Sequence, residues 1–360
     1  MMAPPTAAPA SARLQFLDAV RGWALILMVL NHTGRWWMDA VMRWPRYYLI
    51  YVTLTLAAPM FVFLVGFCLP LSASRGGGDV RAMLGRWGVR GVRIILAGLL
   101  LNVLVFFPED PIWSNGVLQT LGLSILVAAP ASLLLRFRAG RWGLLSAAIG
   151  MYVLFVALFP RLTAWVAAHP RTSRVLFFEF PPWPWLGLVL VGLVLGHWWV
   201  ERRDAAGRTR YMWALTSAGV LCLLWFFGWD LWAQTDNRWM FTRNFSLNNH
   251  WTPRGNTLAW VFGMIFLQIA LGYYLVEIRR LPARWLVILG QAALFLYFTH
   301  HLIVLTLINQ WLGERFNNWW TYGVANALLV LLLVALGRAW QEAKRWYRDH
   351  GPPLGVFGRA

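Results

Sequence analysis

The sequence predicts an all-α integral membrane protein, folded as a single bundle of about ten transmembrane helices. Hydrophobic residues make up 59% of the 360-residue chain and charged residues only 13%, a composition that cannot cover a water-soluble surface. Apolar runs close to the ~20 residues that cross a bilayer recur from the first fifty residues to the last fifty. No room is left for a separate soluble domain, so the spans should pack as one membrane-embedded unit.

The predicted spans follow the apolar runs in chain order. Each span ends where charged or turn-forming residues interrupt the run, and paired tryptophans such as Trp36-Trp37 and Trp319-Trp320 mark helix ends, because indole prefers the headgroup boundary. The spans are 16–35, 50–72, 89–107, 115–135, 142–160, 183–200, 211–229, 256–277, 284–308 and 321–341.

Two flanking segments are expected outside the bundle. Residues 1–12, rich in proline and alanine, are predicted to be a disordered N-terminal tail, and 342–360 a cytoplasmic C-terminal tail, around a transmembrane domain at 13–341. The first apolar run holds Asp18 and Arg21 and follows neither a basic n-region nor a small-residue cleavage site. No cleaved signal peptide is therefore expected.

The distribution of arginine sets the predicted orientation. Arginines gather in the connections at 73–88, 136–141 and 201–210, whereas 108–114 carries two acidic residues and no basic one. Basic loops tend to stay in the cytoplasm, so these three connections are placed inside, together with both termini. The connection at 36–49 falls outside in this scheme despite two arginines, because the rule is only a bias.

Two of the connections placed outside, 161–182 and 230–255, are longer than a turn between helices needs. The second mixes charged and amide side chains with aromatic ones. It is therefore either a solvated loop or a functional one.

The formal net charge of +18 could suggest a nucleic-acid partner. The arginines, however, lie in short connections between apolar runs and not on a soluble face with interleaved aromatic residues, so no nucleic-acid partner is expected. Cys68 and Cys222 lie in separate apolar segments, which predicts small packing residues and neither a disulfide framework nor a metal site.

The first span carries three ionisable residues, which are costly inside a membrane and therefore functional candidates. Asp18 lies one helical turn before Arg21, and His32 follows Arg21 by eleven positions. Eleven residues return to nearly the same helix face, about 16 Å further along the axis. One stripe therefore presents a cation near the cytoplasmic side and an imidazole deeper in the membrane.

That spacing suits an elongated, anionic, activated donor with the shape of acyl-coenzyme A, held by Arg21 at its charged end and reaching His32 at its reactive end. Histidine can remove a proton from an acceptor hydroxyl or amine at neutral pH, and it can itself take up an acyl group. Asn31 could orient an adjacent group or polarise a carbonyl. Alternatively, Asp18 and Arg21 form only a helix-end ion pair and His32 bonds a backbone carbonyl.

A second group of polar residues lies in later spans. Tyr297 precedes His300 by one turn, so the two share a face and His300 could contact the donor or tune His32. His301 points elsewhere and is expected at the membrane interface. Uncharged Asn102 and Gln119 could bind substrate or join helices by hydrogen bonds, and the second role is preferred.

The run from Arg13 to Thr33 resembles the opening signature of the transmembrane acyltransferase superfamily, related to acyltransferase family 3. The matching residues are Leu17, Asp18, Arg21, Gly22 and His32. Further segments resemble the branch that includes heparan-α-glucosaminide N-acetyltransferase: APMFVFLVGFCLPLS from Ala58, GVLQTLGLS around Gln119, WPWLGLVLVGLVLG around Trp185 and Gly187, and LGQAALFLYFTHH around Tyr297 and His300.

The resemblance implies an acyl-CoA-dependent membrane O- or N-acyltransferase. It would move an acyl group, expected to be acetyl, from cytoplasmic acetyl-CoA to a sugar or similar acceptor on the other side of the membrane. By the resemblance His32 is the catalytic histidine and Arg21 a donor-binding residue. From their positions in the spans, Asn31 is added to the catalytic residues and Asp18, Gln119, Tyr297 and His300 to the donor site, and no metal is expected.

Two other functions remain open. A transporter or permease for a small anion would also place Arg21 and His32 on its pathway, but no repeated half is visible. A structural scaffold would leave the stripe unexplained. For the enzyme, the expected partners are acyl-CoA, a carbohydrate or lipid-linked acceptor and membrane lipid, in a bacterial inner membrane. A homodimer is left open.

Overall fold

The computed structural model describes residues 14–39, 42, 56–74, 79–177, 180–202, 204–233 and 257–350. The predicted tail at 1–12, most of the connection at 36–49 and most of the loop at 230–255 lie outside the described residues. The described part is helical and contains no strand, and its one isolated bridge joins Met38 to Phe316. The predicted all-α class is confirmed.

The helices follow the predicted spans in order. The α-helices are α1 (Gln15–Trp36), α4 (Ala57–Ala73), α5 (Val80–Leu101), α6 (Val117–Ala131), α7 (Arg138–Ala168), α8 (Arg174–Phe177), α9 (Pro182–Glu201), α10 (Ala205–Ala233), α11 (Thr257–Tyr273), α12 (Arg284–Gln291), α13 (Ala293–His301) and α14 (Trp319–His350). Four short segments of other helix types continue or end them: η2 (Asn102–Phe106), η3 (Ser132–Arg136), η5 (Tyr274–Ile278) and η6 (Leu302–Trp311).

Eight helical segments of the described part are long and apolar enough to cross a membrane. Apolar α4 is shorter, with 17 residues, and α1 is not among the eight. The chain is therefore a multi-pass membrane protein, while the total of about ten crossings stays a prediction.

Several helices are longer than the predicted spans. The third begins at Val80 and not near residue 89, the fifth runs on to Ala168, and the last continues to His350. The spans were drawn on apolar runs alone, whereas helical hydrogen bonding continues past the hydrocarbon core, where long arginine side chains reach the headgroups. Part of the predicted cytoplasmic tail at 342–360 is accordingly helical.

The ninth predicted span, 284–308, is not one continuous helix. Ala292 interrupts it with non-helical backbone angles, φ −100° and ψ 11°, so α12 and α13 are separate segments. Both face α1, and α13 continues into η6. The hydropathy pattern could not reveal this break, because the apolar run continues through it.

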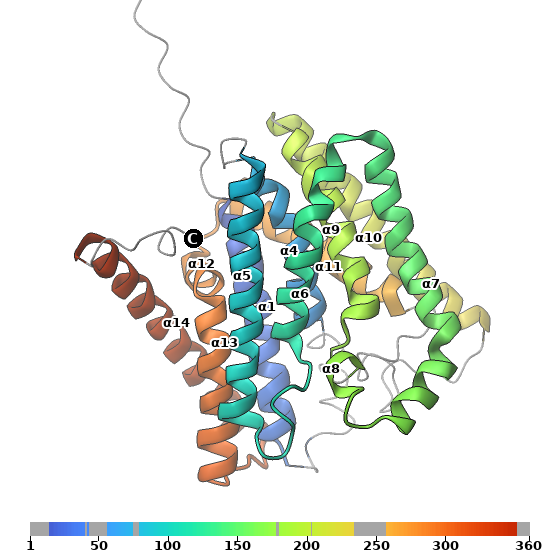
Figure 1. Ribbon diagram of the computed structural model, residues 1–360. Coiled ribbons are helices and arrows are strands. Elements are labelled where there is room, and N and C mark those ends of the chain that lie inside the picture. The colour runs from blue at the N-terminus through green and yellow to red at the C-terminus, as the bar shows by residue number, and fades with distance from the viewer. Residues whose placement is uncertain are drawn as a thin grey trace, which may run out of the picture.

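Helix α1 lies at the centre of the bundle, in contact with α4, α11, α12, α13 and α14 (Figure 1). Its first half packs into one buried apolar cluster with α4, α9 and α11, and its second half into another with α13, η6 and α14. The side chains of α1 are consequently held from several directions over its whole length.

The closest packing in the centre depends on glycines. A Cβ atom on Gly290 of α12 would lie 1.8 Å from the Asp18 carbonyl oxygen, and one on Gly22 would lie 2.0 Å from the Leu286 carbonyl oxygen. Only glycine permits this backbone approach between α1 and α12. The helix that carries the ionisable stripe is thus fixed against the segment that leads into α13.

Candidate functional site

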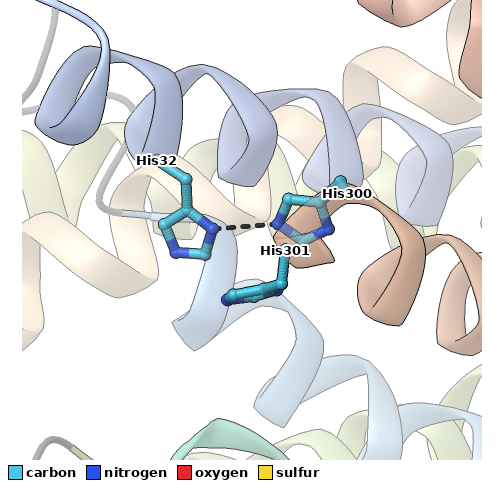
Figure 2. A group of neighbouring side chains, drawn as sticks. All are labelled: His32, His300 and His301. Carbon is cyan, nitrogen blue, oxygen red and sulfur yellow. Dashed lines mark hydrogen bonds between the residues drawn. The ribbon is translucent and has the colours of Figure 1, made fainter. Parts of the chain in front are cut away.

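Three histidine side chains meet where α1 approaches α13. Figure 2 shows His32 of α1 facing His300, with His301 beside both rings. The Nδ1 atom of His32 lies 2.9 Å from Nε2 of His300, a hydrogen-bond distance. The ring centroid of His301 is 4.5 Å from that of His32 and 4.3 Å from that of His300. Residues 268 positions apart in sequence therefore form one cluster.

The hydrogen bonds of His300 determine where the protons lie. Nδ1 of His300 is 3.0 Å from the Leu296 carbonyl oxygen, which can only accept, so this nitrogen carries a hydrogen. In the neutral ring Nε2 is then an acceptor, and His32 must donate to it from Nδ1. Neutral His32 therefore carries its lone pair on Nε2, the nitrogen that points away from His300.

The expectation that His301 lies at the membrane interface is wrong. Only 2% of its surface is exposed, and its Nδ1 donates to the Tyr297 carbonyl oxygen at 2.9 Å. The reason is that α13 is covered on this side too: Phe106 of η2 and Trp36 of α1 both contact the His301 ring. The His301 side chain, which projects about 100° around the α13 axis from that of His300, therefore points into protein and not into lipid.

Aromatic rings surround the cluster and lower its polarity. The Tyr297 ring lies 5.5 Å from His300 and 4.7 Å from His301, and Trp36 lies 4.9 Å from His32. His300 is fully buried, whereas His32 is partly exposed. His32 is therefore the accessible member of the cluster, and Tyr297 packs against the other two.

The other end of the stripe holds a hydrogen-bonded ion pair. Arg21 Nη1 donates to Asp18 Oδ1 at 2.9 Å, and Gln291 Nε2 of α12 donates to Asp18 Oδ2 at 3.2 Å. Asp18 is 1% exposed. The Asp18–Arg21 ion pair is therefore present, and through Gln291, a partner that the sequence reasoning missed, the Asp18 carboxylate also joins α1 to α12. A contact of Asp18 with the donor stays a prediction.

Arg21 differs from Asp18 in that it remains partly accessible. Its side chain is 26% exposed, and its Nη2 lies 2.9 Å from Cys68 Sγ of α4. Since α1 is continuous from Gln15 to Trp36, the distance of about 16 Å along the axis between Arg21 and His32 is retained. The predicted stripe thus exists, with a guanidinium at one end and an imidazole at the other.

Asn102 and Gln119 are used in the connection between α5 and α6. Asn102 Nδ2 donates to the carbonyl oxygens of Ile112 and Ser114, at 2.8 and 2.7 Å. Gln119 accepts from the Gly116 N–H at 3.1 Å at the start of α6. Asn102 thus ties the start of η2 to the connection before α6, whereas the bond of Gln119 caps the start of its own helix. A contact of Gln119 with the donor stays a prediction.

Next to His32, a buried polar network that the sequence did not indicate joins α1 to α14. Thr33 Oγ1 lies 3.0 Å from the Tyr322 hydroxyl and donates to Asn326 Oδ1 at 2.7 Å. All three residues are buried, so the network fixes the end of α1 against α14. Asn31, also on α1, is partly buried.

Comparison with protein families identifies a relationship over most of the chain. Residues 13–232 match the model described as heparan-alpha-glucosaminide N-acetyltransferase, catalytic. The matched stretch includes Asp18, Arg21, Asn31, His32 and Gln119, and it ends before Tyr297 and His300. No curated protein sequence matches the chain.

Proposed function

We propose that His32 is the base of an acyl-transfer reaction. The premise is that the chain belongs to the heparan-alpha-glucosaminide N-acetyltransferase catalytic family. The chain is a membrane enzyme of the acetyltransferase type. The proposed donor is cytoplasmic acetyl-CoA, and the proposed acceptor is a hydroxyl or amine of a glycan or similar molecule outside the cytoplasm. The observation that carries the proposal is the hydrogen bond between His32 Nδ1 and His300 Nε2.

In this reaction His32 Nε2 removes the proton of the acceptor hydroxyl or amine while the acceptor oxygen or nitrogen bonds to the acyl carbon. The donor supplies an activated thioester. As the carbon–sulfur bond breaks, His32 returns the same proton to the departing thiolate. The products are the acylated acceptor and free coenzyme A, and the imidazole is neutral again.

His300 has a positioning role in this scheme. Because its Nδ1–H is bonded to the Leu296 carbonyl oxygen, its Nε2 can only accept, which keeps the proton of His32 on Nδ1 and the lone pair on Nε2. When His32 becomes protonated, the same bond stabilises the imidazolium that forms. The buried His300 thus does for His32 what a carboxylate does in a catalytic triad, without adding a negative charge to the membrane interior.

The same lone pair could attack the thioester directly and form an acyl-histidine before the acceptor binds. The two routes differ in one observable. Incubation with radiolabelled acetyl-CoA in the absence of acceptor should label the protein only in the second route. The label should then be absent from His32→Ala.

Arg21 is the proposed contact for the anionic part of the donor. It is already charge-paired to Asp18, yet its guanidinium has further N–H groups and remains 26% exposed. Arginine binds phosphate oxygens in two places at once. A donor held there would lie along α1, with its thioester toward His32.

The proposed orientation places both termini inside, in a bacterial inner membrane. Single cysteines at Ser74, Ala139 and Ser246, in a chain without Cys68 and Cys222, can be treated with an impermeant thiol reagent in intact cells. Labelling is expected at position 246 alone, a position outside the described residues. Labelling at 74 and 139 instead would invert the protein and place donor binding outside.

The direct test uses purified protein in detergent with acetyl-CoA and a panel of amino sugars and hydroxyl acceptors. We expect release of coenzyme A and appearance of acetylated acceptor in equal amounts. A small-anion transporter using the Arg21 and His32 stripe would leave the thioester intact. Intact acetyl-CoA after prolonged incubation with each acceptor class would contradict the proposed reaction.

A further inference from the structure

The three histidines that form the proposed base, its positioning residue and their neighbour are also residues that commonly bind metal ions. His32, His300 and His301 each offer a ring nitrogen, and these atoms all lie within 4.8 Å of one another. The three rings come from α1 and α13, whose buried side chains share one apolar cluster (Figure 2). We propose that the cluster binds one divalent transition-metal ion of the zinc class, and that this ion inhibits the enzyme.

Two of the three rings are already oriented as metal ligands. Nδ1 of His300 and Nδ1 of His301 donate to the carbonyl oxygens of Leu296 and Tyr297, respectively. Ligating histidines almost always donate their second ring N–H to a carbonyl or carboxylate in this way, which fixes the tautomer and the ring plane. The Nε2 atoms of both rings therefore carry lone pairs.

His32 completes the set through a change of tautomer. Its Nδ1 is 2.9 Å from His300 Nε2, whereas two nitrogens at about 2.0–2.1 Å from a tetrahedral zinc ion are about 3.4 Å apart. These two nitrogens must therefore separate by roughly 0.5 Å, and the His301 nitrogen, which lies within 4.8 Å of both, must approach them by up to about 1.4 Å. The proton of His32 Nδ1 moves to Nε2, so all three ligands remain neutral imidazoles.

The ligand set favours zinc, copper, nickel or cobalt over magnesium or calcium, because the hard ions prefer oxygen ligands. The cluster contains no thiolate or carboxylate, so the double charge of the ion is not compensated by these residues. A fourth position stays open for water, hydroxide or chloride. The ion should therefore bind reversibly and exchange with the solution.

The inhibitory part of this inference rests on the proposed function. Metal at Nδ1 of His32 places a hydrogen on Nε2, the atom proposed to remove the acceptor proton. The same ion also breaks the bond from His32 to His300. Base and metal therefore compete for one imidazole, and the binding site can exist even if the chemistry is different.

His301 separates metal binding from catalysis, because it belongs to the proposed metal site and not to the proposed reaction. Asparagine at this position keeps a donor for the Tyr297 carbonyl oxygen and lacks the Nε2 ligand atom. His301→Phe, which fills the space beside Phe106 without a ligand, is a second variant. The control is His169→Ala, which removes an exposed histidine near the end of α7.

The experiment titrates chelator-treated protein in detergent with Co²⁺, whose visible absorption reports nitrogen ligands in tetrahedral geometry, followed by displacement with Zn²⁺. We expect one Co²⁺ per chain in the wild-type protein and in His169→Ala, and at least a tenfold weaker binding in His301→Asn and His301→Phe. Equal affinity in all four proteins, or no Co²⁺ bound by the wild type, would overturn the inference.

The inhibition is measured separately with Zn²⁺ in the transfer assay. Wild type and His169→Ala should lose activity as Zn²⁺ saturates the site, whereas His301→Asn should keep most of its own zinc-free activity over the same Zn²⁺ range. Zinc that binds through all three histidines without slowing transfer would contradict the inhibitory role. If no transfer is detected in any protein, the proposed function fails while the Co²⁺ titration still decides the metal site.

Discussion

The polar groups at the two ends of α1 differ in how their hydrogen-bonding atoms are satisfied. At one end Asp18 is buried and receives hydrogen bonds from Arg21 and Gln291, so its charge is compensated within the protein. At the other end His32 bonds His300 through one nitrogen and keeps the lone pair of its second nitrogen directed away from that partner. The first contact holds two helices together, whereas the second, in the proposed reaction, leaves a lone pair for proton transfer.

The comparison also explains why both groups are tolerated inside the membrane. An unpaired carboxylate would be far more costly there than a neutral imidazole, so Asp18 requires its partners for folding. The histidines can remain neutral and need only hydrogen bonds. Substitutions at the histidine end should therefore change the reaction rate, and those at the aspartate end should mainly change stability.

The largest effect is expected from His32→Ala. Loss of the proposed base should lower the rate of acetyl transfer by about 10²–10⁴ at saturating donor. The thermal unfolding temperature in detergent should stay near that of the wild type, because His32 is only partly buried. Transfer rate and unfolding temperature are measured on the same preparation, and wild-type turnover in this variant would remove His32 from the mechanism.

The second prediction concerns His300, through the pair His300→Leu and His300→Gln. Leucine fills the space but cannot accept from His32 Nδ1, so kcat should fall by about 10² through loss of the correct tautomer and orientation. Glutamine offers an oxygen near the position of Nε2 and should recover part of kcat. KM for acetyl-CoA should stay unchanged in both variants.

This pair separates positioning from packing. If His300 only fills space, leucine should be the better substitute and glutamine the worse one, in activity as well as in unfolding temperature. A higher kcat for His300→Leu than for His300→Gln would therefore contradict the positioning role.

The sequence predicted the fold class and the order of the helices because long apolar runs carry a strong signal. It also placed Asp18, Arg21 and His32 on one face, since a single helix fixes their geometry. It could not place helix ends within the headgroup region, as Val80 and His350 show. In the headgroup region both helical and non-helical segments are polar, so hydropathy does not show where a helix ends.

The contacts between segments distant in sequence were harder to predict from the sequence. A role for His300 beside His32 was predicted from its pairing with Tyr297, but the bond between the two histidines and the inclusion of His301 depend on how α13 crosses α1. Gln291 was missed for the same reason. It follows Gly290, whose close packing against Asp18 is visible only once the helices are assembled.

The third prediction tests the aspartate end through Gly290→Ala. The added Cβ would lie 1.8 Å from the Asp18 carbonyl oxygen, so α1 and α12 must move apart, at a cost of about 1–3 kcal/mol in the free energy of unfolding. The control is Gly150→Ala on α7, where a Cβ meets no atom within 4 Å. Urea or thermal unfolding in detergent should show destabilisation for the first variant only, and equal stability of both would refute the close contact.

The smallest effect is expected from Arg21→Lys, which tests whether the aspartate end also binds the donor. Lysine keeps a positive charge beside Asp18 but cannot grip phosphate oxygens in two places, so KM for acetyl-CoA should rise about tenfold with little change in stability. If Arg21 serves only the ion pair, KM should stay constant instead. A comparison of Arg21→Gln with the double variant Asp18→Asn, Arg21→Gln sharpens this test. The single variant leaves Asp18 without its positive partner, whereas the double variant removes both charges together and leaves neither of them unpaired. The double variant should unfold at a higher temperature than Arg21→Gln alone, yet its KM should remain as high as that of the single variant. Recovery of donor affinity along with stability would assign Arg21 wholly to the fold.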